Sequence, residues 1–432
     1  MLENNNSGNM YLSTEVGNIP KGWKIKTLGD LFNFSGGFTA SRDQLSNKGF
    51  CYLHYGDIHM TDKTYIDVEK EYLDIPKLNV ELKKVAKSSL LNDGDVVFVD
   101  ASEDDDGVSK HIVVRNTKEI NYISGLHTIV AKSKGNELDN LYKQFCFKTS
   151  NIKKQFKFYA VGTKVSGISK SNVKNILIPV PDIKEQKAIA TALSDMDDLI
   201  LSLEKLINKK KLIKEGAMEE LLTGKKRLDG FNDEWKSKKF NEVCWFQEGP
   251  GLRNWQFTNS GMKVINVTNL EFGYLNLSKT DRHISLEEFN KMYKHFEIDE
   301  HDIVMASSGN SYGKVAIVRK QDLPLLMNTS VIRFKPINKL NYNFLLQFLK
   351  SKLFISQINL LITGGAQPNF GPAHLNKIEI NLPVTIEEQM VIGNILSDMD
   401  KEIEKLEKKL DKYKSIKSGM MEELLTGKRR LV

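Results

Sequence analysis

The feature that most constrains this chain is a long internal repeat. A stretch that begins at Ile183, "IKEQKAIATALSDMDDLILSLEKLINKKKLIKEGAMEELLTGKKRL", matches one that begins at Ile386, "IEEQMVIGNILSDMDKEIEKLEKKLDKYKSIKSGMMEELLTGKRRL". The two copies stay 203 residues apart throughout, so nothing is inserted or deleted between Ile183 and Leu228. One inserted residue would rotate every later side chain of a helix by about 100°. The uninterrupted repeat therefore predicts a long helix at each copy.

Apolar residues recur along both copies at alternating steps of three and four, which is the pattern of a coiled-coil seam. The predicted seam consists of Ile189, Leu193, Met196, Ile200, Leu203 and Ile207 in the first copy and of Ile392, Leu396, Met399, Ile403, Leu406, Leu410 and Tyr413 in the second. Charged runs such as "EKLEKKLDKYK" lie between these positions and are typical of a solvated helix surface. A helix of ~40 residues would span roughly 60 Å.

Neither helix can leave so apolar a stripe in water, so each needs a packing partner. The simplest solution for two copies separated by a globular segment is an antiparallel pair. The alternative is that each helix packs separately on its own domain. The pairs Thr223-Gly224 and Thr426-Gly427 predict a helix C-cap after each copy, with glycine supplying a positive φ.

The segments outside the helices also resemble each other, weakly. Both open on a tryptophan followed by lysines, at Trp23 and Trp235, both contain strand-like runs, and both close on a glycine-containing loop, a strand and a proline. Two domains with one scaffold and divergent loops should bind two versions of one kind of ligand. The predicted fold class is α+β: two mixed α/β domains, separated and joined by two long helices that form an antiparallel coiled coil, with a pseudo-twofold internal repeat.

Composition adds a few limits. The 432 residues suffice for two or three domains, and a net charge of +7 permits a polyanionic partner without requiring one. Cys51, Cys146 and Cys244 show no CxxC spacing, which favours a reducing, cytoplasmic location. Residues 1–17 lack the features of a signal peptide and are predicted to be a disordered leader. No run approaches the ~18 apolar residues of a membrane helix.

The sequence contains no recognisable pattern of a catalytic or metal site. There is no G-x-x-x-x-G-K-[ST] loop and no G-x-G-x-x-G after a strand, which argues against a dinucleotide or methyl-donor site. The eight histidines form no H-E-x-x-H motif and no cluster with cysteines. We therefore predict no catalytic residue and no metal ligand, and we interpret the chain as a binding protein.

From about residue 17 onward, the arrangement resembles the DNA-specificity subunit of type I restriction-modification systems. The most specific matches lie in the helix repeat: Glu185-Gln186, "LSDMD" at Leu193–Asp197 and "LLTGKKRL" at Leu221–Leu228, with Glu388-Gln389, Leu396–Asp400 and Leu424–Leu431 in the second copy. The loop from Gly162 to Ile168 also fits the family, whereas "GGAQPNFG" at Gly364 departs from it.

The resemblance implies a leader (1–17), two target recognition domains (18–182 and 229–385) and two coiled-coil helices (183–228 and 386–432). Each recognition domain would read one half of a bipartite, non-palindromic DNA site, and the helices would fix the separation of the halves. Two methyltransferase subunits would dock on the helical region and restriction subunits would join them. The chain itself would be non-catalytic and without cofactor, because S-adenosylmethionine, ATP and magnesium would be bound by subunits that perform adenine-N6 methylation and ATP-dependent cleavage.

Base edges are read mainly by Arg, Lys, Asn and Gln, and phosphates by Lys, Arg and backbone amides. The polar loop residues predicted to contact DNA are Thr39, Ser41, Arg42, Tyr55, Lys110, Lys164, Lys170, Arg253, Asn254, Gln256, Asn269, Asn310, Tyr312, Lys314, Gln367 and Asn369. The residues predicted to dock the partners are Glu185, Gln186, Glu219, Glu220, Glu388, Gln389, Glu422 and Glu423. The repeated "MEELLTGK" is interpreted as a surface that two identical partners need twice, the alternative being a helix stop alone. Trp23 and Trp235 are expected to be core anchors.

Other functions remain open at this point. A coiled-coil scaffold whose globules bind peptides would show no salt-dependent affinity for DNA. An enzyme with an unrecognised site would turn over substrate as the purified chain. The chain could also be the specificity subunit of another type of restriction enzyme.

Overall fold

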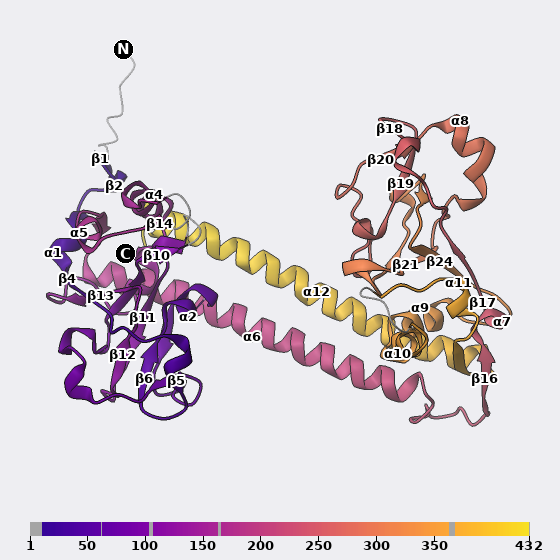
Figure 1. Ribbon diagram of the computed structural model, residues 1–432, viewed down its shortest axis with the longest axis horizontal. Helices are drawn as coiled ribbons and strands as arrows, with labels where there is room; N and C mark the ends of the chain where they lie inside the picture. Colours follow the sequence, from indigo (N-terminus) through magenta and orange to yellow (C-terminus); the bar gives the residue numbers. More distant parts are fainter. Residues whose placement is uncertain (1–10, 62, 103–106, 163–165, 363–367, 432) are drawn as a thin grey trace, which may run out of the picture. The chain divides into compact units, whose positions relative to one another are not determined.

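The chain folds into two compact units, each built from one globule and a part of each long helix (Figure 1). Unit 1 comprises Met1–Ser202 and Leu410–Val432, and unit 2 comprises Leu203–Lys409. The computed structural model describes residues 11–431 apart from 62, 103–106, 163–165 and 363–367.

The long helices begin where the repeat predicts. α6 (Ile183–Leu221) and α12 (Ile386–Leu424) contain 39 residues each. Gly224 and Gly427 then adopt φ values of +72° and +71°, which confirms the predicted C-caps. The helices therefore end before Leu228 and Leu431, because these glycines turn the chain out of the helix.

Within each unit the two helices run antiparallel. In unit 2, Lys214 Nζ lies 2.5 Å from Asp400 Oδ1, and in unit 1 the equivalent Lys417 pairs with Asp197. Burial alone would raise the pKa of Asp400, but the charges of Lys350 and Lys214 outweigh it and lower that pKa. Every residue of the predicted seam is buried or half-buried. Helix pairing and packing on a globule occur together, so the two arrangements considered for the helices are not exclusive.

Unit 1 contains a five-stranded sheet in the order β4-β13-β9-β11-β7, in which β11 and β7 are parallel and the other neighbours antiparallel. A four-stranded sheet in the order β12-β6-β8-β5 and three two-stranded ribbons complete it. The strands are β1 (Tyr11–Thr14), β2 (Gly17–Pro20), β3 (Lys24–Thr27), β4 (Phe32–Gly36), β5 (Leu45–Ser46), β6 (Phe50–Leu53), β7 (Tyr65–Asp67), β8 (Lys77–Leu78), β9 (Val96–Val99), β10 (Ala101–Ser102), β11 (His111–Arg115), β12 (Tyr122–Ser124), β13 (Thr128–Ser133), β14 (Ser166–Gly167) and β15 (Leu177–Val180).

Unit 2 repeats this topology with fewer strands. Its sheets have the orders β17-β24-β21-β22 and β18-β20-β19-β23, and the parallel pair β19·β23 corresponds to β6·β12 of unit 1. The antiparallel ribbon β16·β25 corresponds to β3·β15. The strands are β16 (Trp235–Lys239), β17 (Cys244–Glu248), β18 (Phe257–Thr258), β19 (Met262–Ile265), β20 (Arg282–Ile284), β21 (Ile303–Ala306), β22 (Val315–Ile317), β23 (Leu326–Met327), β24 (Val331–Pro336) and β25 (Glu379–Pro383).

Short helices cover the sheets and connect the strands. Thr149 and Ser351 cap α4 and α10, each accepting a hydrogen bond from a backbone amide of the first turn at 3.3 Å. The shorter helices are α1 (Leu28–Leu31), α2 (Tyr55–Met60), α3 (Lys143–Cys146), α4 (Ser150–Tyr159), α5 (Lys170–Lys174), α7 (Phe240–Val243), α8 (Leu286–Glu288), α9 (Tyr342–Lys350), α10 (Lys352–Leu361) and α11 (Pro372–Leu375).

The ends of the long helices belong to the cores of the globules. In unit 1, Leu193 of α6 and Leu424 of α12 are buried in one cluster with the residues of the five-stranded sheet. In unit 2, Leu396 of α12 and Leu221 of α6 occupy the equivalent places. Each core is thus closed by the start of one helix and the end of the other, and burial of these leucines stabilises both the globule and the helix ends.

The predicted disordered leader is wrong over residues 11–17. Tyr11–Thr14 and Gly17–Pro20 form the antiparallel hairpin β1·β2, and the Tyr11 hydroxyl lies 3.3 Å from the carbonyl oxygens of Gly427 and Lys428. This tether to the end of α12 was not visible in the sequence, because short strands bearing asparagine and glycine have weak local signals. Residues 1–10 of the predicted leader lie outside the described residues.

Candidate nucleic-acid interface

In unit 1 the predicted DNA-contacting residues that the structure describes lie on loops and at the starts of short helices, and backbone contacts hold these segments together. Phe38 forms a bridge with Gly125, so the loop after β4 lies beside the loop after β12. The Ile168 amide donates to the Asp100 carbonyl oxygen at 2.8 Å, which ties the segment before α5 to the end of β9. A rigid frame of this kind can present variable side chains in fixed positions.

Arg42 is anchored to the start of α2. Its Nη2 atom lies 2.6 Å from Asp57 Oδ1 and 3.3 Å from His54 Nδ1, which also accepts from the Gly56 amide at 3.1 Å. Burial lowers the pKa of His54 and the charge of Arg42 lowers it further, so a neutral imidazole accepts these bonds at pH 7. The Arg42 side chain nevertheless remains 56% exposed and available to a ligand.

Tyr55 and Lys110 lie in the same neighbourhood. The Tyr55 ring is 5.3 Å from the ring of His127 and 6.0 Å from that of His59, both edge-on. Lys110 Nζ donates to the His59 carbonyl oxygen at 2.6 Å. The structure therefore brings the predicted residues Arg42, Tyr55 and Lys110 together around α2.

The other predicted residues of unit 1 are less constrained. Thr39, Ser41 and Lys170 are exposed, the first two on the loop after β4 and the third at the start of α5. Lys164 lies outside the described residues.

The corresponding loops of unit 2 also lie side by side. The Thr329 amide donates to the Pro250 carbonyl oxygen at 2.9 Å, the Ser307 amide donates to the Ser330 carbonyl oxygen at 2.9 Å, and Ser308 forms a bridge with Asn369. The predicted residues that these loops expose are Arg253, Asn254, Asn310 and Asn369. Gln367 lies outside the described residues.

Two predicted DNA contacts of unit 2 are wrong. Asn269 is fully buried: its amide donates to the Asn276 carbonyl oxygen at 3.0 Å, and its oxygen accepts from Thr280 at 2.7 Å. Gln256 is also buried, and its side chain bonds Glu288 at 2.5 Å and Tyr293 at 3.0 Å. Both side chains use their polar atoms to shape loops, and breaking such buried bonds to reach a base would be costly.

Tyr312 and Lys314 are both half-buried, and each has a partner within unit 2. The Tyr312 hydroxyl donates to Asn359 Oδ1 at 2.7 Å. Lys314 Nζ lies 3.3 Å from Glu271 Oε2 and 5.6 Å from the centre of the Phe272 ring. Hydrogen bonds from Lys279 and Lys314 lower the pKa of Glu271, so this carboxylate is ionised at pH 7 and competes with phosphates for the lysines.

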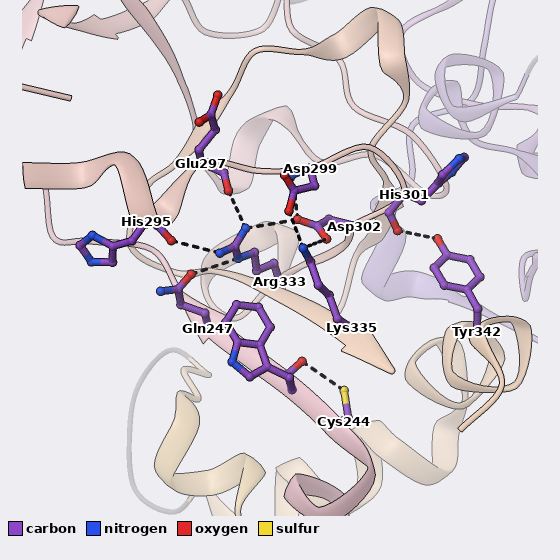
Figure 2. A network of polar contacts seen from close by, with 11 residues as sticks. Cys244, Gln247, His295, Glu297, Asp299, His301, Asp302, Arg333, Lys335 and Tyr342 are labelled. Carbon is purple, nitrogen blue, oxygen red and sulfur yellow. Dashed lines mark hydrogen bonds and ion pairs between the residues drawn. The ribbon is translucent and has the colours of Figure 1, made fainter. Parts of the chain in front are cut away.

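A buried arginine fastens the segment that precedes β21 in unit 2 (Figure 2). Arg333 donates to Gln247 Oε1 at 3.0 Å and to the carbonyl oxygens of Glu297 and His295 at 2.5 and 3.1 Å. Its Nη1 also lies 3.4 Å from Asp302 Oδ2. The network ties the segment from His295 to Asp302 to strand β24 of the central sheet.

The prediction that Glu185, Gln186, Glu388 and Gln389 dock partners is wrong. All four side chains are fully buried. Glu388 accepts two bonds from Arg227 at 3.0 Å and one from Trp235 at 3.3 Å. Equivalent bonds reach Glu185 from Arg430 and Trp23, the latter at 2.9 Å, and each glutamine bonds the backbone of its own globule. These residues make buried contacts between the long helices and the globule of their own unit, so they cannot form a docking surface.

The repeated octapeptide has the same internal role. Leu221, Leu222 and their equivalents Leu424 and Leu425 are core residues, and a Cβ on Gly224 would lie 3.1 Å from the Trp235 ring. Its exposed acidic residues remain as predicted docking candidates: Glu219, Glu220, Glu422 and Glu423. Both tryptophans anchor the globules to the helix ends, which confirms their expected role.

Sequence reasoning missed two exposed aromatic residues near these loops in unit 2. Trp255 is 80% exposed and Phe272 is 79% exposed. The composition of either loop gives no sign that its aromatic residue faces outward, since aromatic residues are more often buried.

Within the described residues, no three His, Cys, Asp or Glu side chains are grouped so that they could hold a metal ion. Over the same part of the chain, no helix has the length and apolar character needed to cross a membrane.

Comparison with known proteins matches residues 20–214 and 232–412 to the type I restriction modification DNA specificity domain. The type I restriction enzyme MjaVIII specificity subunit of Methanocaldococcus jannaschii is 30% identical over 314 residues, which cover 69% of this chain and 72% of that protein. The MjaIX specificity subunit of the same organism is 23% identical over 449 residues, covering 98% and 96%. A crystal structure of a type I restriction-modification system S subunit from M. genitalium has the same fold, with a TM-score of 0.55 at 16% identity over 93% of this chain and 96% of that chain.

Proposed function

Since the chain belongs to the family of type I restriction-modification DNA specificity subunits, we propose that its two units read the two halves of a bipartite, non-palindromic DNA sequence. Unit 1 would read one half through the loops around Arg42, Tyr55 and Lys110. Unit 2 would read the other through the loops that carry Arg253, Asn254 and Asn310. The long helices would set the number of unspecified base pairs between the halves.

One observation carries this proposal: the two units repeat the same frame but expose different side chains. The sheet orders, the parallel pair and the buried glutamate junctions recur in both units. The two units therefore share a backbone frame, and their exposed loops differ. Such an arrangement suits two recognition sites that bind the same kind of ligand but read different DNA sequences.

We propose that catalysis lies in partner subunits and that this chain contributes recognition alone. Two methyltransferase subunits would bind the repeated helices at the exposed pairs Glu219-Glu220 and Glu422-Glu423, and restriction subunits would join them. S-adenosylmethionine would be bound by the methyltransferases, ATP by the restriction subunits, and magnesium by the partners. Internal pseudo-symmetry suits two identical partners, because each would meet the same surface.

The test is to co-express the full chain with the methyltransferase encoded beside it and to sequence the host DNA for modified adenines. The expected result is one split motif, with two specified blocks around a spacer of fixed length. A stable complex that modifies no DNA would favour the coiled-coil scaffold instead. A motif without interruption would contradict the assignment of one half-site to each unit.

A further inference from the structure

The two globules share a second repeat that is more exact than their sequences suggest. From Trp23 to Gly49, residues of the first globule correspond to residues 212 positions later in the second, so that Trp23 matches Trp235 and Leu28 matches Phe240. Leu28 and Phe240 are both fully buried and both begin a short helix, α1 and α7. The correspondence continues without insertion through the loop after β4 and the loop after β17.

Two pairs of glycines frame these loops at equivalent positions. A Cβ on Gly37 or Gly249 would lie 1.7 or 2.2 Å from a backbone carbonyl oxygen of the neighbouring loop. A Cβ on Gly49 or Gly261 would lie 2.2 or 2.1 Å from another backbone oxygen, and both glycines have positive φ. Contacts this short exclude any other residue without backbone movement. The segments between the glycines, 38–48 and 250–260, therefore have the same length and the same fixed ends.

A glutamine shapes the turn inside each frame. The Ser41 amide donates to Gln44 Oε1 at 2.8 Å, and the Arg253 amide donates to Gln256 Oε1 at 2.7 Å. Each bond closes one turn of 3₁₀-helix, Arg42–Gln44 in unit 1 and Asn254–Gln256 in unit 2. A two-residue strand follows both turns, β5 and β18. The two units thus present the residues before the glutamine from the same local backbone structure.

The three exposed residues before the glutamine differ completely. They are Ser41, Arg42 and Asp43 in unit 1 and Arg253, Asn254 and Trp255 in unit 2. A guanidinium followed by a carboxylate is replaced by an amide followed by an indole. Leaving most of an indole in water forgoes a large hydrophobic gain, so a ligand surface that covers Trp255 would be favourable.

We infer that Ser41–Asp43 and Arg253–Trp255 are matched specificity tripeptides, and that Gln44 and Gln256 are the residues that position them. The inference rests on the proposed function and names the side chains that distinguish the two half-sites. Arginine pairs with guanine and asparagine with adenine in the major groove, and an indole packs against the faces or methyl groups of bases. Exchanging the tripeptides should therefore exchange base preference without disturbing the frame.

The experiment exchanges the tripeptides in the full chain, co-expressed with the adjacent methyltransferase, and sequences the modified host DNA. Arg253→Ser/Asn254→Arg/Trp255→Asp should change one block of the motif and leave the other block and the spacer intact. Ser41→Arg/Arg42→Asn/Asp43→Trp should change the other block. Modification of the original motif should fall about ten- to a hundredfold in each case. Lys238→Ser, at an exposed position of β16, is the matched control and should change nothing.

Either exchange variant that assembles with the methyltransferase and keeps the original motif at the original rate overturns the inference. If neither variant assembles, Trp255→Ala decides, because removing an exposed side chain leaves the frame intact; unchanged modification then overturns the role of Trp255. Gln44→Ala should relax the block read by unit 1, and Gln44→Glu, which keeps the acceptor for the Ser41 amide, should restore it. A wild-type chain that gives no split motif contradicts the proposed function itself, which separates the two failures.

Discussion

The two units keep identical side chains at the helix ends but differ inside their sheets. Glu185 and Glu388 are both fully buried and both bonded to an arginine and a tryptophan. On the central sheets, by contrast, Val130 of unit 1 occupies the place that Arg333 takes in unit 2, since both face equivalent valines across the ladder. At a helix end one glutamate lies at the start of one long helix and bonds both an arginine that follows the other long helix and a tryptophan of the globule. A substitution there would break all of these contacts at once. A sheet position needs only to suit its own neighbours, so it can change with the loops.

The largest effect should come from removing the arginine of a junction. Arg227→Ala leaves the buried carboxylate of Glu388 without its charged partner, and Arg430→Ala does the same to Glu185. We expect each change to destabilise its own unit by about 3 kcal/mol or more. Pulse-labelling hydrogen exchange across a urea series would measure this in each unit separately. Lys225→Ala, at an exposed neighbouring position, should change little, and equal loss in both units from one substitution would contradict the separate junctions.

Arg333→Ala should destabilise unit 2 by about 2 to 4 kcal/mol, because buried acceptors lose their donor. The loss should appear first as faster exchange in the segment 294–302, which Arg333 fastens. Lys335→Ala is the control: its side chain is 37% exposed and also pairs with Asp302, so a smaller effect is expected. Unchanged protection of that segment in Arg333→Ala would show that the arginine does not hold it.

Acid should weaken unit 1 before unit 2. Burial lowers the pKa of His111 to about 3, and the charge of Lys148 adds to this effect. In the unfolded chain the His111 imidazole therefore takes up a proton below about pH 6.5, whereas in the folded unit it stays neutral until the pH approaches 3. The free energy of unfolding of unit 1 is therefore highest above pH 6.5 and falls as the pH is lowered from 6.5 towards 3. The loss at pH 5 should be about 2 kcal/mol. Val315 stands at the equivalent place in unit 2, and His111→Val should remove this pH dependence in the same urea experiment.

The smallest expected difference separates the two C-cap glycines. A Cβ on Gly427 would lie 2.4 Å from the Pro20 ring, whereas one on Gly224 would lie 3.1 Å from the Trp235 ring. Both alanine variants should lose about 1 kcal/mol to the positive φ. Gly427→Ala should lose about 1 kcal/mol more than Gly224→Ala, because the proline ring must move. Equal urea midpoints for the two variants would contradict this contact difference.

The helices could be predicted from sequence because their repeat, seam and glycine caps are all local and periodic. The class of the globules and their tandem order followed from the weaker framework matches. The burial of Glu185 and Asn269 could not be predicted from the sequence. Polar residues are usually exposed, and only the tertiary packing shows that these two are buried. The docking prediction assumed that Glu185-Gln186 and Glu388-Gln389 are repeated because they bind a partner. They are repeated because each pair makes the same buried contacts inside its own unit.

Residue type and loop position predicted Arg42 and Asn254 as DNA contacts, and the structure exposes both side chains. They did not point to Trp255, which is exposed as well. The signal was present in the constant register of the segments Trp23–Gly49 and Trp235–Gly261 and in the glycines that frame each loop. The two loops can be aligned only when Gln44 and Gln256 are known to occupy the same place in the backbone. The three side chains before each glutamine have nothing in common. Geometry, rather than similarity, identifies the equivalent positions.

The core of unit 1 includes the end of α12, which is distant in sequence, and this affects the order in which the chain can fold during biosynthesis. Unit 1 needs Leu424 and Arg430, which are translated more than 200 residues after α6 begins. The first globule to leave the ribosome therefore waits, with a buried carboxylate unmatched and part of its core uncovered, until the second globule has been made. Unit 2, which is contiguous from Leu203 to Lys409, has no such wait. A message cut short within α12 would thus yield a chain whose first globule is incomplete, and such a chain is a natural substrate for chaperones and proteases.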